Sequence, residues 1–224
     1  MYILQGGVRW YANCGFSHRS SMSFGQERAP KSAPTTCTKP LYCIFKKMTK
    51  AEKLNTIPVS GEYEEIIFDL PEPWRGQSWN FVKFTLSDGT NWCGQFREKD
   101  KGNFHIADLP DKGIACVVSG GHGYIVDIDK KEKIKDLNTE PLIDIYADKE
   151  TNIFYVASWW SMHFIDENFN EIDMPIPIGC DGIQFKEATN RTLGLEIEET
   201  GADMIKNNDY YIDLIKREIK KNAV

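Results

Sequence analysis

The stretches GIACVVS (residues 113–119) and NIFYVAS (residues 152–158) decide the fold of this chain. Each is a short apolar run that follows a turn residue and ends in serine, and the two lie 39 residues apart. Such runs are typical of short β-strands. An apolar pair and an aspartate follow each run, as Ile125-Val126-Asp127 and Phe164-Ile165-Asp166. The sequence therefore predicts a repeated β unit.

Each copy of the repeat has room for four short strands. We expect them at 104–107, 114–119, 124–128 and 133–137, and again at 142–147, 153–158, 163–166 and 170–174. A weaker third copy starts at Ile183. Upstream, residues 82–86 and 92–96 alternate around the turn Asp88-Gly89, which predicts a hairpin. The fold class predicted is mainly β, an antiparallel meander of four-strand units.

A four-strand unit of about 40 residues resembles a β-propeller blade. The resemblance covers roughly residues 104–197 and concerns architecture alone, because the Gly-His and Trp-Asp signature of WD40 blades is not in register. It implies a propeller-like ring. An open meander or two packed sheets fit the same pattern, since the chain has room for about four units, few for a ring.

The end of the chain shows a different period. Tyr211, Leu214 and Ile215 lie at the three- and four-residue spacing of an apolar helix face. Asn207 or Asn208 would cap this helix, and basic residues crowd its last turns, as the helix dipole favours. We therefore expect one C-terminal α-helix at residues 208–221, packed on the sheet.

Charge divides the chain near Met48. Seven of the 27 basic residues but one of the 33 acidic residues precede it, so residues 1–47 carry +6 and residues 48–224 carry −12. Residues 17–40 are rich in Ser, Thr and Pro and lack periodicity. We expect residues 1–47 to be a disordered or non-native extension, or alternatively a transit peptide. Residues 48–224 would form a single β-rich domain.

Composition excludes several classes of function. The acidic balance argues against nucleic acid as a partner, and no apolar run approaches the roughly 20 residues of a membrane span. The six cysteines form no CxxC pair, and we expect reduced thiols in a cytoplasmic protein. No calcium-loop pattern accompanies the acidic pairs, among them Glu196 and Glu198 on one strand face. We expect neither a metal nor a cofactor.

His122 is the best candidate for chemistry. It lies in the glycine-rich stretch SGGHGY (residues 119–124), five residues before Asp127, and a His with a nearby Asp can act as a general base. The glycines are equally explained by a tight turn between strands. We therefore predict no catalytic residue.

Aromatic residues give a stronger signal of binding. If Trp159 and Trp160 are extended, their side chains point to opposite faces, so one of them is exposed. Exposed Trp and Tyr are frequent anchors of protein interfaces. The predicted contact residues follow Ser119 or Ser158, where repetition would gather them at one end of the molecule: Trp159, Trp160, His122, Tyr124, Asp127 and Asp166.

These features favour a non-catalytic, acidic binding protein whose partner is a basic protein. One specific form is an immunity or antitoxin-type inhibitor of a basic toxin, by analogy with other small acidic proteins. The alternative is a carbohydrate-binding module or a hydrolase that uses the glycine-rich His122 loop.

Overall fold

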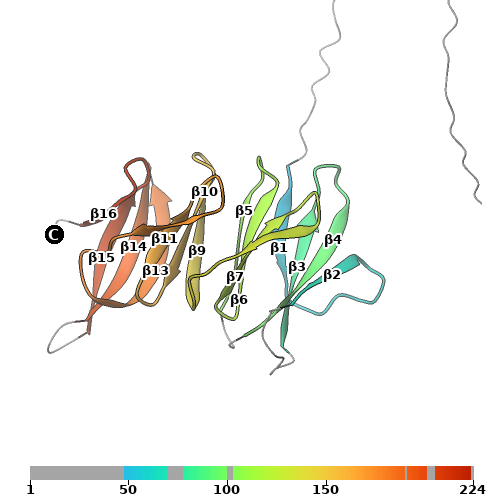
Figure 1. Ribbon diagram of the computed structural model, residues 1–224, viewed down its shortest axis with the longest axis horizontal. Coiled ribbons are helices and arrows are strands. Elements are labelled where there is room, and N and C mark those ends of the chain that lie inside the picture. The colour runs from blue at the N-terminus through green and yellow to red at the C-terminus, as the bar shows by residue number, and fades with distance from the viewer. Residues whose placement is uncertain (1–47, 70–77, 100–102, 190, 201–204, 223–224) are drawn as a thin grey trace, which may run out of the picture. The chain divides into compact units, whose positions relative to one another are not determined.

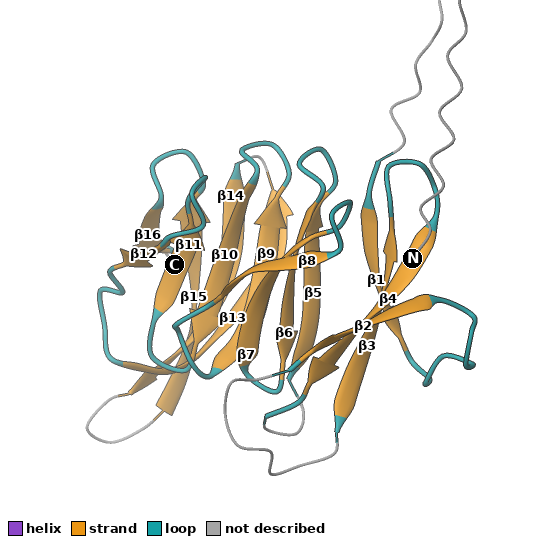
Figure 2. Cartoon of the chain, turned by 45° about the vertical axis from the view of Figure 1, so that its right-hand side comes forward, coloured by secondary structure: helices purple, strands orange, loops and turns teal. Residues whose placement is uncertain are grey.

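The computed structural model describes residues 48–69, 78–99, 103–189, 191–200 and 205–222. Within these ranges the chain forms four four-stranded sheets, connected by turns and loops (Figure 1). Figure 2 shows no helix in this part of the chain, and hence none long and apolar enough to cross a membrane. The prediction of a mainly β chain with repeated strand units is confirmed. The expectation for residues 1–47 lies outside the described residues.

The sheets follow one another along the chain. The first contains β1 (Lys50–Leu54), β2 (Glu64–Phe68), β3 (Trp79–Thr85) and β4 (Asn91–Arg97). The second contains β5 (Phe104–Leu109), β6 (Ile114–Ser119), β7 (His122–Asp127) and β8 (Glu132–Asp136). The third contains β9 (Leu142–Asp148), β10 (Ile153–Ser158), β11 (Met162–Ile165) and β12 (Glu171–Met174). The fourth contains β13 (Cys180–Thr189), β14 (Thr192–Thr200), β15 (Ile205–Asp213) and β16 (Glu218–Lys221).

Successive sheets pack face to face and share three apolar cores. Val82 and Trp92 of the first sheet meet Val117 of the second. A second core joins the other face of the second sheet to the third, and a third core joins the third sheet to the fourth. The second and third sheets are thus covered on both faces. This explains why β6 and β10 are buried along their whole length and are apolar without alternation.

The first strands of the four sheets lie along one side of this stack. β5 contacts both β1 and β9, and β9 contacts β13. The inner strands of propeller blades have the same arrangement, but here the first and fourth sheets lie at opposite ends of a row (Figure 1). The described residues therefore form an open row of blade-like sheets, and the propeller-like ring is not formed.

The 39-residue spacing has a structural cause. Val117 pairs with Tyr124 across the β6–β7 turn, and Val156 pairs with His163 across the β10–β11 turn. Val156 lies 39 residues after Val117, and His163 lies 39 residues after Tyr124. Equivalent sequence positions therefore occupy equivalent places in the second and third sheets.

The predicted C-terminal α-helix at 208–221 is wrong. Those residues belong to the antiparallel strands β15 and β16, with Asp213 accepting hydrogen bonds from the backbone N–H groups of the turn between them. Tyr210, Ile212 and Leu214 alternate into the core against the third sheet, whereas Ile215 is exposed. The two-residue period of the buried side chains prevails over the three- and four-residue spacing because β14 offers an edge to pair with.

The first sheet departs from the simple meander. β2 occupies an edge of this sheet and runs parallel to β4, so its partner is the second strand of the β3–β4 hairpin that follows it in the sequence. The hairpin was predicted and is confirmed. β1 and β2 were not predicted, because parallel pairing is non-local and neither segment shows a long apolar alternation.

Candidate functional site

Two turns at one end of the stack carry three of the six predicted contact residues, namely His122, Trp159 and Trp160. Residues 119–122 join β6 to β7, and residues 158–162 join β10 to β11. Leu142 links the two turns, because its N–H donates to the carbonyl oxygen of Gly121 over 2.8 Å and it pairs with Ser158 across the third sheet. The turns therefore lie at the same end, which we call the serine-turn end.

The glycines before His122 are required by the turn itself. Gly120 and Gly121 have φ angles of 57° and 83°, which L residues with side chains rarely adopt. A Cβ atom on Gly121 would also lie 3.0 Å from the Cβ of Pro141. Turn geometry and a close approach to the β8–β9 connection account for these residues, so they do not indicate a ligand-binding loop.

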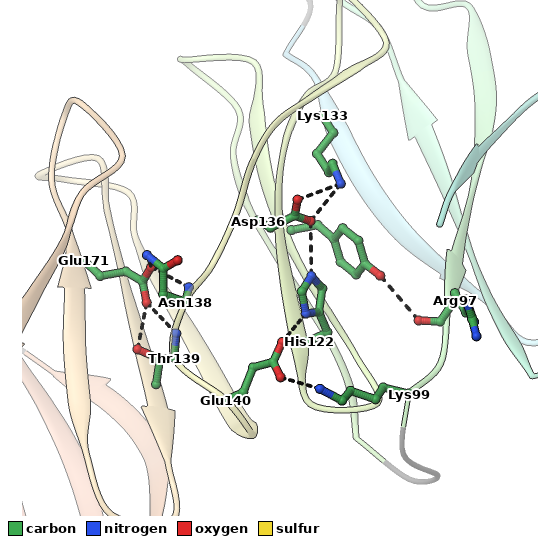
Figure 3. Close-up of polar contacts among 10 residues, drawn as sticks. Arg97, Lys99, His122, Lys133, Asp136, Asn138, Thr139, Glu140 and Glu171 are labelled. Carbon is green, nitrogen blue, oxygen red and sulfur yellow. Dashed lines mark hydrogen bonds and ion pairs between the residues drawn. The ribbon is translucent and has the colours of Figure 1, made fainter. Parts of the chain in front are cut away.

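His122 is held between two carboxylates (Figure 3). Its Nδ1 bonds Glu140 and its Nε2 lies 3.1 Å from Asp136 Oδ1. The side chain is only 8% exposed. His122 starts β7, whereas its two partners come from the end of β8 and the following connection, so the imidazole ties that connection to the second sheet.

Each carboxylate also has a lysine partner. Lys99 Nζ lies 2.7 Å from Glu140 Oε2, and Lys133 Nζ lies 2.8 Å from Asp136 Oδ1 (Figure 3). Partial burial acts to raise the pKa of both acids. Hydrogen bonds and ion pairs with the lysines and His122 outweigh it, so both pKa values are lowered. The carboxylates therefore stay ionised well into the acidic range.

The same connection is fixed from the third sheet. Glu171 on β12 accepts hydrogen bonds from the backbone N–H of Asn138, over 2.7 Å, and of Thr139, over 2.9 Å. Their side chains donate to the same carboxylate (Figure 3). His122 and Glu171 thus hold the β8–β9 connection from both sides. This geometry serves to position a loop.

The arrangement gives His122 no catalytic geometry. A general base needs a ring nitrogen that can reach a substrate proton, but both nitrogens of His122 already face carboxylates. Asp127 is not one of these partners. It lies at the far end of β7, where it accepts a hydrogen bond from the backbone N–H of Lys130.

The structure separates the predicted contact residues into three groups. Tyr124 is fully buried and packs edge-on against His122, with ring centroids 4.7 Å apart. Asp127 and Asp166 belong to turns at the opposite end of their sheets, and Asp166 accepts hydrogen bonds from the N–H groups of residues 168 and 170. Of the six predicted contact residues, Trp159 and Trp160 are the two that are exposed at the serine-turn end.

The tandem tryptophans occupy the positions that Gly120 and Gly121 hold in the second sheet. The Ser158 hydroxyl accepts hydrogen bonds from the N–H groups of Trp160 and Ser161, which fixes the turn. Trp159 is 41% exposed and Trp160 is 62% exposed. The indole N–H of Trp160 donates to Asp181 over 3.3 Å. This turn thus offers two oriented aromatic side chains to a partner.

A cleft of about 410 Å³ opens beside Trp159. It lies where β5, β9 and β13 begin, on the side of the stack formed by the first strands. Its lining combines apolar and aromatic walls with acidic groups, and it includes Asn103, Asp144, Trp159, Phe185, Glu196 and Glu198.

The charge of the cleft is acidic. Asp144 accepts hydrogen bonds from the backbone N–H groups of Ile145 and Phe185, both over 2.8 Å, which fix the position of its side chain. Lys186 lies 3.1 Å from Glu196 but is shared with another acid outside the cleft. Within the described part of the chain, the carboxylate of Glu198 has no hydrogen bond or ion pair. It faces the cleft with an uncompensated charge.

Sequence reasoning did not find this cleft, because its lining comes from three sheets. The pair Glu196 and Glu198 was noted on one strand face, and Trp159 was a candidate, but nothing joined them. The repeat in the sequence could have indicated that these residues lie together, because it places the first strands of successive units side by side. Trp159 then follows β10, next to the strand that begins at Cys180.

The described residues hold no cluster of three His, Cys, Asp or Glu side chains suited to a metal ion. The three cysteines among them, Cys93, Cys116 and Cys180, are buried and unbridged. Burial raises the pKa of Cys93 to about 11, so its thiol stays protonated. No family model matches the chain, and no curated protein matches it either.

Proposed function

We propose that this chain is a non-catalytic binding protein that recognises a basic protein partner through its serine-turn end. The observation that carries the proposal is the pair Trp159 and Trp160, exposed beside an acidic cleft. Large aromatic side chains bury much area at little entropic cost and are enriched among the residues that dominate binding.

The charge around the tryptophans favours a basic partner. Asp181 bonds the Trp160 ring, and Asp144 and Glu198 line the neighbouring cleft. Acidic groups around an aromatic anchor speed association with a cationic surface and exclude anionic ones. An inhibitor of a basic toxin, the form considered from the sequence, is one instance of this proposal.

Catalysis at the glycine-rich loop is not part of the proposal, because His122 is buried and engaged at both nitrogens. The carbohydrate-binding alternative has one supporting observation, the exposed tandem tryptophans, on which sugar rings stack. A glycan array separates the two. Binding of a glycan that Trp160→Ala abolishes would favour the carbohydrate module over the protein partner.

The test is selection of a random displayed-peptide library on the immobilised full chain. We expect enriched peptides with a net positive charge, whose affinity falls as NaCl rises. Trp160→Ala should weaken them at least about tenfold, the effect of losing a well-buried aromatic anchor.

Ile215→Ala is the matched control, because Ile215 is 60% exposed, like Trp160, but lies in the β15–β16 turn. It should leave peptide affinity unchanged. Enrichment of no peptide, or equal losses with the two variants, would contradict binding at the serine-turn end.

A further inference from the structure

The cleft beside Trp159 has the features of a site for one particular side chain. We propose that it accepts a guanidinium group, that of an arginine side chain on the protein partner. This inference rests on the proposed function and names the chemistry of its central contact. The cleft volume, about 410 Å³, falls within the range of roughly 300–1,000 Å³ that is usual for ligand pockets.

The floor of the cleft at Gly182 lies between an aromatic ring and a carboxylate. A Cβ atom on Gly182 would lie 3.3 Å from Glu198 Oε2 and 4.0 Å from Trp159 Cε3. Glycine at this position leaves the space between the aromatic ring and the carboxylate open. An occupant resting on Gly182 therefore contacts both groups at once.

The second argument is chemical. A guanidinium group is planar, stacks on aromatic faces and donates two parallel hydrogen bonds to one carboxylate. Trp159 supplies the ring, and Glu198 supplies a carboxylate without another partner among the described residues. The ammonium group of a lysine would also be attracted by the negative charge, but it can neither stack on the ring nor donate two parallel hydrogen bonds to one carboxylate.

The third argument is the surrounding field. Lys186 is shared between Glu196 and Asp209, and His105 lies 3.5 Å from Asp144. The acids Asp144 and Glu196 add negative charge to the same cleft. An anionic occupant would be repelled by these groups. A neutral occupant would separate Glu198 from water without compensating its charge, which is costly.

The experiment is a titration of the ¹⁵N-labelled full chain with three five-residue peptides that differ only at the centre, where they carry arginine, citrulline or lysine. The readout is the indole N–H signal of Trp159, assigned by its loss in Trp159→Phe. We expect the arginine peptide to shift this signal and to bind at least about tenfold more tightly than the citrulline peptide. The lysine peptide should fall between them.

Two isosteric variants provide the control. Glu198→Gln should weaken the arginine peptide about tenfold, whereas Glu187→Gln, which removes an exposed charge from the same sheet but outside the cleft, should change its affinity less than twofold. Gly182→Ala should also lower the affinity for the arginine peptide, because the added methyl group occupies space between Trp159 and Glu198. Thermal unfolding of each variant verifies that the fold is retained.

Equal affinities for the arginine and citrulline peptides, equal effects of the two glutamine variants, or no shift of the Trp159 signal would overturn the inference. The outcome is distinguishable from failure of the proposed function. Library peptides that depend on Trp160 but not on Glu198 would keep the binding surface and remove the guanidinium site. If no library peptide is enriched either, both proposals fail.

Discussion

His122 illustrates how a residue with catalytic potential serves a structural purpose. Its ring joins Asp136 and Glu140, which would otherwise face each other as two partly buried anions. We expect His122→Ala to lower the free energy of unfolding by about 2 kcal/mol, the cost of leaving buried polar partners unsatisfied. Urea denaturation measures this loss. Affinity for peptides at Trp159 should be retained, and its loss would place His122 in the binding site.

The same cluster predicts a dependence of stability on pH. The folded pKa values of Asp136 and Glu140 lie below their ordinary values of 3.8 and 4.5, so unfolding in acid takes up protons. The stability they supply is complete above about pH 5 and is lost as pH falls through the lowered values. The free energy of unfolding should therefore decrease from about pH 5 to 3.

Glu140→Gln isolates the contribution of one acid, because glutamine keeps an acceptor but cannot titrate. It should reduce the slope of the free energy of unfolding against pH in this range. Glu167→Gln, at an exposed turn position, serves as the control and should leave the slope unchanged. Identical slopes for all three proteins would show that the His122 cluster does not carry the effect.

At the scale of elements, the hairpin of β15 and β16 buries one of two nearby isoleucines and exposes the other. The helix prediction placed Ile215 on the apolar face and left Ile212 off it. In the structure Ile212 is fully buried and Ile215 is exposed. Ile212→Lys should cost about 4 kcal/mol or more, since it buries a charge, whereas Ile215→Lys should change stability by less than about 0.5 kcal/mol. Thermal unfolding compares the two, and the reverse order would restore the helix.

The β6–β7 turn gives a second contrast at this scale. Gly121 and Gly61 both have φ near 85°, but only Gly121 is approached by another segment, namely Pro141. Alanine at either position incurs a backbone penalty of about 1 kcal/mol. Gly121→Ala should cost about 1–2 kcal/mol more, because Pro141 has to shift. Equal losses of stability in urea denaturation would show that the close approach is unimportant.

The strands of the second and third sheets were predictable because their signals are local. Continuous apolar runs fix β6 and β10, and short turns connect them to partners nearby in the sequence. β2 and β15 were not predictable in the same way. β2 depends on parallel pairing with the second strand of a hairpin, and β15 carries two overlapping apolar periods that only pairing with β14 resolves.

At the scale of the whole molecule, the row of sheets explains where binding surfaces arise. Stacking buries the faces of the second and third sheets and leaves their turns as the variable positions. The second sheet fills its turn with glycines, which let the β8–β9 connection approach, whereas the third fills the equivalent turn with tryptophans. One repeat position thus serves folding in one unit and exposes aromatic side chains in the next.

The candidate site was only partly predictable for the same reason. Trp159 and Trp160 were found from the sequence on the expectation of an extended segment with one tryptophan in the core, whereas both lie in the β10–β11 turn and both are exposed. Packing between sheets buries His122 and Tyr124, and the length of β7 separates His122 from Asp127. The cleft could not be predicted from the sequence, because packing between sheets brings Asp144, Phe185 and Glu198 to Trp159.

The most direct measurement is the crystal structure of the full chain bound to the arginine-containing peptide. We expect the guanidinium group to lie in the cleft, stacked on Trp159 and paired with Glu198, while the rest of the peptide follows the serine-turn end past Trp160. A peptide bound to the opposite end of the sheets, or along an outer strand with an empty cleft, would contradict this expectation.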